Sequence, residues 1–130
     1  MNPKHTLKEQ SFKVDAETIR AYAELSQDFN PIHLDPAFAE KTVVGEVIAH
    51  GTIALCLLWK SIAASFDNTV DFGGLSLEVK FIGPVRVDDI ITAGGHLQAG
   101  TTHRYDVWVQ GQDKLDRVTG VLEIQGSTNS

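Results

Sequence analysis

A short segment near residue 30 combines a carboxylate, an amide and an imidazole. Asp28 and His33 lie five residues apart, with Asn30 and Pro31 between them. Because the unperturbed pKa of histidine lies near neutrality, a neighbouring carboxylate can fix its tautomer or share a proton transfer with it. Pro31 disfavours helical geometry at Asn30, so the segment is predicted to form a stiff turn. The predicted chemistry is acid–base catalysis, in which Asn30 orients Asp28, His33 or a water between them.

A second candidate feature is the pair His50-Gly51, which directly precedes the longest apolar stretch of the chain. The first turn of a helix has N–H groups without partners and carries the positive end of the dipole, which together favour a developing oxyanion. A glycine there lets the carbonyl group of a ligand come close to the backbone. Residues 51–66 are apolar around the whole helical circle, so we predict a central helix enclosed by other structure.

Each feature also has an ordinary structural explanation. Polar turns followed by a surface histidine are common, and so are plain helix starts. His33, Asp35 and His50 are conceivable metal ligands, but their spacing matches no recognised zinc motif, and no metal is predicted. Cys56 lies within the apolar helix and is predicted to be a small core residue. From spacing alone, the catalytic and the structural interpretations of the turn both stay open.

The other elements must hold these two features together. A helix is expected from its N-cap Asp15 to Gln27 or Asp28, and Pro36 can open a further short helix. Alternating apolar and polar residues predict strands on either side of the central helix. The predicted strands cover residues 7–14, 75–81, 91–97, 104–109 and 118–124. Four consecutive strands after the helix predict an antiparallel sheet that wraps around it in an α+β fold, and the exposed sheet edges favour pairing with a second copy.

Length and composition limit the possible classes of protein. The 130 residues, 42% of them hydrophobic, fit a single domain over residues 1–130. Cys56 is the only cysteine, so an intrachain disulfide is impossible and a cytoplasmic location is expected. The N-terminus lacks a signal-peptide pattern and no apolar stretch reaches membrane-spanning length, so no membrane association is expected. The net charge of −6 argues against a nucleic-acid partner.

The segment from Ser26 to Asp35, followed by Ile48 to Gly51, resembles the hydratase motif of the MaoC-like (R)-specific enoyl-CoA hydratases. The resemblance extends over nearly the whole chain. It implies a hot-dog fold, in which an antiparallel sheet wraps around a central helix. It also implies that a homodimer adds water reversibly to a trans-2-enoyl-CoA, giving the (R)-3-hydroxyacyl-CoA. No metal or redox cofactor is implied, and coenzyme A is part of the acyl-CoA substrate.

The resemblance further implies a role for individual residues. Asp28 and His33 match the catalytic pair that holds and activates the water and carries the α-proton. Asn30 matches the residue that orients this pair, and Gly51 matches the position whose N–H binds the thioester carbonyl oxygen. Four further residues are predicted to contact the substrate, namely His50, Thr52, Trp59 and Ile62.

Two departures from the family pattern bear on the substrate. The loop Val43–Val47 lacks the proline and the aromatic residue that are frequent in relatives, and Trp59 stands where smaller residues are usual. If Trp59 faces the acyl tunnel, it shortens it, so we predict a preference for short acyl chains. The competing hypotheses are a hot-dog acyl-CoA thioesterase and a catalytically silent acyl-CoA-binding subunit. The intact set of four catalytic positions favours the hydratase over both.

Overall fold

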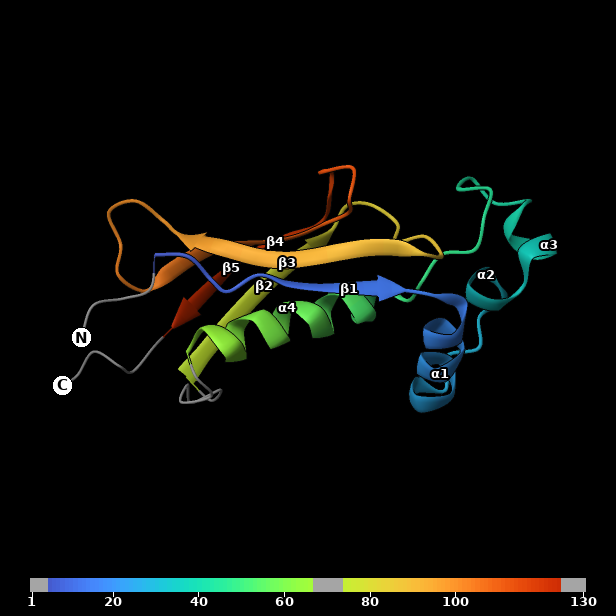
Figure 1. Ribbon diagram of the computed structural model, residues 1–130, viewed down its shortest axis with the longest axis horizontal. Coiled ribbons are helices and arrows are strands. Elements are labelled where there is room, and N and C mark those ends of the chain that lie inside the picture. Colours follow the sequence, from blue (N-terminus) through green and yellow to red (C-terminus); the bar gives the residue numbers. More distant parts are fainter. Residues whose placement is uncertain (1–4, 67–73, 125–130) are drawn as a thin grey trace.

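A computed structural model describes residues 5–66 and 74–124. A five-stranded sheet forms one layer, the long helix α4 lies against it, and three shorter helices gather at one end (Figure 1). The elements are β1 Gln10–Val14, α1 Ala16–Ser26, α2 Pro31–Leu34, α3 Pro36–Ala39, α4 Gly51–Ser65, β2 Leu75–Phe81, β3 Asp89–Leu97, β4 Arg104–Gln110 and β5 Asp116–Ile124. This order confirms the predicted α+β arrangement and adds the helix α2, which was not predicted.

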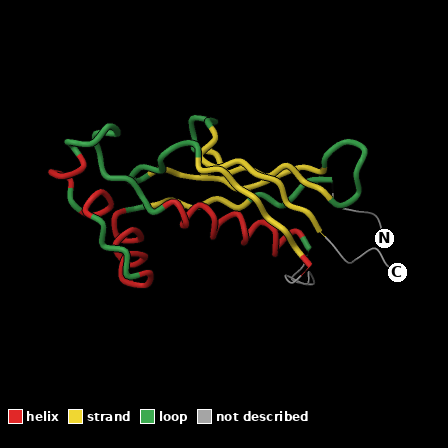
Figure 2. Tube along the Cα trace, turned by 180° about the vertical axis from the view of Figure 1, so that it is seen from behind, coloured by secondary structure: helices red, strands yellow, loops and turns green. Residues whose placement is uncertain are grey.

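The sheet has the strand order β1-β3-β4-β5-β2, and every neighbouring pair is antiparallel. The strands form a continuous layer with α4 on one side of it (Figure 2). Strand β2 pairs with β5 rather than with the next strand in the chain, so the segment from Ile82 to Asp88 crosses the end of the sheet. Strands β1 and β2 are therefore its edges. Among the described residues, no helix is both long and apolar enough to cross a membrane.

Helix α4 packs one side against the sheet and leaves the other side open. Its buried apolar residues are Ile53, Ala54, Leu57, Leu58 and Ile62. Thr52, Cys56 and Lys60 are exposed, and Trp59 is half-buried. A single sheet covers a helix from one direction only, so the prediction that α4 is enclosed on all sides is wrong within one chain. The prediction that Cys56 is a core residue is wrong for the same reason.

Two serines on α4 attach the helix to the segment before β1. Ser61 Oγ donates to the Lys8 carbonyl oxygen at 2.6 Å, and the Lys8 N–H donates to Ser65 Oγ at 2.7 Å. Both serines are fully buried, at 0% exposure. In the sequence they interrupt an apolar helix, but in the fold each hydroxyl bonds to the backbone of Lys8 and so joins α4 to the segment before β1.

Candidate active site

Helix α1 ends in a geometry that brings Asp28 next to the start of α4. Its C-cap Gln27 is left-handed, with a φ of 60°, and the Asp28 N–H donates to the Ala23 carbonyl oxygen at 3.1 Å. A left-handed residue turns the chain away from the helix axis. The helix therefore ends where it was predicted to end, and the backbone of Asp28 reaches the ring of His50.

The turn after Asp28 starts a one-turn helix that carries His33. Asn30 is its N-cap and accepts from the Ile32 N–H at 3.1 Å, and Pro31 occupies the first helical position. An asparagine N-cap followed by proline is a local helix-start signal. The backbone N–H of Asn30 also donates to Asp28 Oδ1 at 3.3 Å. The side chain of Asn30 thus caps the helix that carries His33, and its backbone N–H holds the carboxylate of Asp28.

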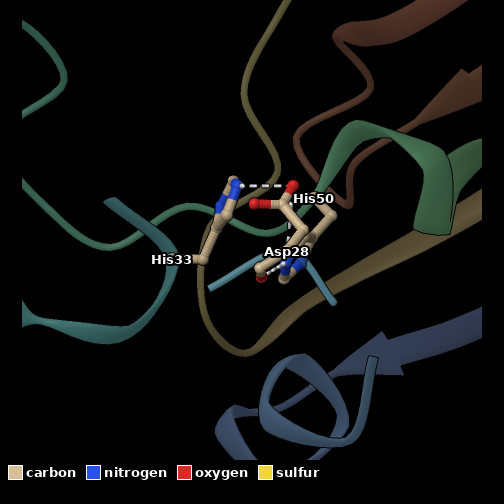
Figure 3. Close-up of side chains that lie close together, drawn as sticks. All are labelled: Asp28, His33 and His50. Atoms are coloured by element: carbon tan, nitrogen blue, oxygen red, sulfur yellow. Dashed lines mark hydrogen bonds and ion pairs between the residues drawn. The ribbon is translucent and has the colours of Figure 1, made fainter. Parts of the chain in front are cut away.

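The tautomer of His33 follows from its backbone partner. Its Nδ1 lies 2.8 Å from the Ile48 carbonyl oxygen, which can only accept, so in the neutral ring Nδ1 carries the hydrogen. The lone pair then lies on Nε2, which is 3.8 Å from Asp28 Oδ2 (Figure 3). The His33 side chain is 12% exposed and that of Asp28 is 50% exposed, so solvent reaches the pair from the side of the carboxylate.

His50 contacts both members of this pair. Its Nε2 lies 3.0 Å from the Asp28 carbonyl oxygen, and its ring stacks on that of His33 with 3.8 Å between centroids (Figure 3). The residue is 3% exposed, and its Nδ1 is buried with no partner among the described residues. His50 was predicted to contact the substrate. The structure places Nε2 at the backbone of Asp28 and buries Nδ1, so that contact stays a prediction which this packing does not favour.

The start of α4 offers free N–H groups beside the pair. Gly51 is the first residue of α4, and no side chain caps this end of the helix. The Ile53 N–H donates to the His50 carbonyl oxygen at 3.0 Å, which leaves the N–H groups of Gly51 and Thr52 available to a ligand. The glycine also has a structural reason, because a Cβ at this position would lie 3.2 Å from two atoms of the Phe81 ring. The structure thus brings together three predicted residues, Asp28, His33 and Gly51.

The other predicted contacts are more dispersed. Thr52 is exposed in the first turn of α4, and its Oγ1 accepts from the Tyr22 hydroxyl at 2.6 Å. Trp59 lies eight residues after Gly51, about 12 Å along the helix axis, and Ile62 is fully buried in the core at 0% exposure. A contact between Ile62 and substrate is not favoured by this packing. From the sequence, Tyr22 was expected only on the buried face of the helix after Asp15, although a half-buried tyrosine hydroxyl usually has a polar partner.

The same side chains form a possible metal-ligand group. One atom each from Asp28, His33 and His50 lies within 4.8 Å of the others. The fit to a cation is poor, because His50 Nε2 donates its hydrogen to the Asp28 carbonyl oxygen and would have to give up that bond to ligate. Asp35, which the sequence offered as an alternative ligand, instead caps α3 by accepting from the Ala37 and Phe38 N–H groups.

The sequence of this chain matches a known protein family and is similar to named enzymes. Residues 2–120 match the family described as MaoC like domain. Over 84 residues the chain is 38% identical to the (R)-specific enoyl-CoA hydratase of Aeromonas caviae, a match that covers 64% of this chain and 61% of that protein. Over 76 residues it is 36% identical to the mitochondrial 3-hydroxyacyl-[acyl-carrier-protein] dehydratase of Arabidopsis thaliana, covering 58% of this chain and 44% of that protein. The chain thus spans between about two fifths and three fifths of these relatives.

Solved structures have the same fold. The structure titled as the (R)-hydratase from A. caviae involved in PHA biosynthesis has a TM-score of 0.76 and 27% identity, and the match covers 95% of this chain and 97% of that one. The unliganded R-hydratase PhaJ1 from Pseudomonas aeruginosa also has a TM-score of 0.76, with 24% identity and coverage of 97% and 82%. These matches confirm the predicted hot-dog fold.

Proposed function

Because this chain belongs to the MaoC-like domain family, we propose that it adds water to the double bond of a trans-2-enoyl-CoA. The product is the (R)-3-hydroxyacyl-CoA, and the reverse reaction is its dehydration. The observation that carries the proposal is the facing pair Asp28 Oδ2 and His33 Nε2, 3.8 Å apart, next to the uncapped start of α4.

This pair is suited to holding a water molecule. With the His33 hydrogen on Nδ1, both facing atoms accept hydrogen bonds and cannot bond to each other. A water molecule has two hydrogens and can donate one to each atom, which leaves an oxygen lone pair free to attack carbon. The separation of 3.8 Å is too long for a direct hydrogen bond. The half-exposed carboxylate gives water access to this position.

The proposed steps balance within the substrate and this water. The oxygen bonds to C3 of the enoyl group while one of its hydrogens passes to the acid–base pair. The electrons of the C2=C3 bond move to the thioester oxygen as an enolate, and the pair then returns the proton to C2. The reaction is redox-neutral, so we propose no redox cofactor. Each positioned acid–base group typically contributes about 10²–10⁴-fold to the rate.

The enolate oxygen needs a donor, and we assign this task to the N–H of Gly51. The first turn of α4 combines free N–H groups with the positive end of the helix dipole. One such donor is typically worth about 10²–10³-fold. The site thus has a water-handling part, Asp28 and His33, and a carbonyl-handling part, Gly51, joined through His50, which contacts the pair and directly precedes Gly51.

The working unit is proposed to be a cytoplasmic homodimer. Beyond its first turn, the outer side of α4 exposes Cys56 and Lys60, and strand β2 leaves one edge unpaired. A second copy would extend the sheet and cover this side of the helix. Analytical ultracentrifugation at several protein concentrations tests this part, and a monomer at micromolar concentration would contradict it. The single cysteine is consistent with a reducing compartment.

One experiment separates the candidate functions. Crotonyl-CoA is mixed with the protein, and loss of the conjugated enoyl absorbance is followed together with release of free thiol. Loss of absorbance without thiol supports hydration, thiol release indicates a thioesterase, and neither change indicates a binding subunit. Chiral analysis of the 3-hydroxybutyryl product tests the (R) configuration. Because one relative is named for an acyl-carrier-protein substrate, the same assay with crotonyl-acyl-carrier protein tests our choice of coenzyme A as the carrier.

A further inference from the structure

We propose that the hydroxyl of Thr52 is a second hydrogen-bond donor to the thioester oxygen, beside the N–H of Gly51, and that Tyr22 is the positioning residue that aims it. The proposal rests on the proposed function for its substrate. Its starting point is the hydrogen bond from the Tyr22 hydroxyl to Thr52 Oγ1, 2.6 Å long, at the first turn of α4.

The direction of this bond determines where the Thr52 hydrogen can go. A threonine hydroxyl has one hydrogen to donate and two lone pairs. Because Oγ1 accepts from Tyr22, its own hydrogen points elsewhere. Inside a helix it would often bond to the carbonyl oxygen four residues earlier. For Thr52 that carbonyl belongs to Ile48, which lies outside α4 and accepts from His33. The hydrogen of this exposed hydroxyl is therefore available to a ligand.

The hydroxyl belongs to the same cluster as the acid–base pair. The ring of Tyr22 lies 5.0 Å from that of His50, and His50 stacks on His33 at 3.8 Å. Thr52 also follows Gly51 directly in the first turn. Contacts thus run without interruption from the proton-handling residues to the Thr52 hydroxyl. A thioester oxygen that accepts from the Gly51 N–H lies at the first turn of α4, which also carries the Thr52 hydroxyl.

The hydrogen bond from Tyr22 also strengthens the proposed donor. A hydroxyl that accepts a hydrogen bond is polarised and becomes a better donor. Donors of this kind contribute most when charge develops on the oxygen, as it does in the enolate. Since Thr52 is exposed to solvent, its effect should be smaller than that of an enclosed oxyanion donor. We expect about a tenfold effect on kcat, below the roughly 10²–10³-fold of an enclosed donor.

Kinetics of matched variants test the donor and its positioning. In crotonyl-CoA hydration, Thr52→Val should lower kcat about tenfold and raise KM about fivefold, because the hydroxyl also bonds to the carbonyl of the bound substrate. Thr52→Ser, which keeps the hydroxyl, should recover most of both losses. Tyr22→Phe should lower kcat about threefold, and the double variant should match Thr52→Val, because Tyr22 then has nothing to aim. Thr102→Val, the same change in the exposed β3–β4 loop, is the control and should match the wild type.

Three kinetic results would overturn the proposal. These are a Thr52→Val kcat within about twofold of wild type, a Thr52→Ser variant as impaired as Thr52→Val, or losses from Tyr22 and Thr52 that multiply in the double variant.

A binding test separates this proposal from the hydratase assignment. Calorimetry compares butyryl-CoA with its thioether analogue S-butyl-CoA, which lacks the carbonyl oxygen. Thr52→Val should weaken binding of the thioester about fivefold and leave the thioether unaffected. If the wild type does not hydrate crotonyl-CoA but this difference appears, the proposed function fails and the donor stands. Equal effects on both ligands, or none on either, would reject the donor.

Discussion

Two of the clusters of ionisable side chains in the described part of the molecule, one around Arg117 and one around Asp28, differ in how closely their atoms approach. Around Arg117, the guanidinium bonds to both carboxylate oxygens of Asp113 at 3.1 and 3.2 Å and to the Leu115 carbonyl oxygen at 2.9 Å. Around Asp28, the carboxylate lies 3.8 Å from His33 and 4.0 Å from His50. The charged atoms of the first cluster, called the closed cluster below, bond directly to each other, whereas those of the second, the open cluster, lie beyond hydrogen-bond distance.

The two clusters also differ in the parts of the chain that they connect. The Arg117 side chain is 7% exposed, and it also lies 3.6 Å from Asp89. Asp89 accepts from the Arg86 N–H, and the neighbouring Val85 carbonyl accepts from the Ala49 N–H at 2.7 Å. The closed cluster thus supports the segment that leads into His50, while the open one lies at the start of α4. We infer that the first cluster stabilises the fold and that the second is used for chemistry.

The largest expected effect comes from removing charge from the open cluster. Asp28→Asn should lower the rate of crotonyl-CoA hydration about 10²–10⁴-fold, because the amide cannot take a proton from water. The melting temperature should change little, since the Asp28 carboxylate is half exposed and accepts from one N–H group, that of Asn30. His33→Ala should cause a similar loss. Activity near that of the wild type in either variant would show that the cluster does not carry the chemistry.

The corresponding change in the closed cluster should act on stability. Arg117→Met keeps apolar bulk but removes the hydrogen bonds to Asp113 and Leu115, which should cost about 2 kcal/mol in the free energy of unfolding. Urea denaturation followed by circular dichroism measures this. The hydration rate per folded molecule should stay within a fewfold of wild type. A rate loss as large as that of Asp28→Asn, with unchanged stability, would reverse the comparison.

A smaller effect, on the preferred length of the acyl chain, is expected from replacing Trp59 on the outer side of α4. Trp59 is half-buried there, about 12 Å from Gly51. If it limits the acyl chain, Trp59→Gly should raise kcat/KM for an octenoyl thioester about tenfold relative to crotonyl-CoA, in line with the pocket energy of a few methylene groups. Competition between the two substrates in one reaction gives the ratio directly. An unchanged ratio would show that Trp59 does not set the chain length.

The helix caps and turns that depend on neighbouring residues could be predicted from the sequence. Asp15 accepts from the Thr18 N–H at 2.8 Å as the expected N-cap, and the turn after Gln27 forms as expected. Contacts between distant segments were harder to foresee. Tyr22 and Thr52 are 30 residues apart, and no local pattern joins them. The exposure of Cys56 likewise depends on which side of α4 the sheet covers. Spacing alone did not show that Asp28 and Gly51 belong to one site, and only the family resemblance predicted it.

The smallest effect concerns the acid stability of the closed cluster. Hydrogen bonds from Arg117 and then from the Leu115 N–H lower the pKa of Asp113 from its ordinary value of 3.8. A carboxyl whose folded pKa is lowered binds fewer protons in the folded than in the unfolded state, so its stabilising effect is present above that ordinary value and is lost as the pH falls through the folded pKa. Below about pH 4, wild type should therefore lose its stability advantage over Asp113→Asn. Urea midpoints of both proteins from pH 7 to pH 3 measure this, and a constant difference across the range would rule out the charged form of Asp113 as its source.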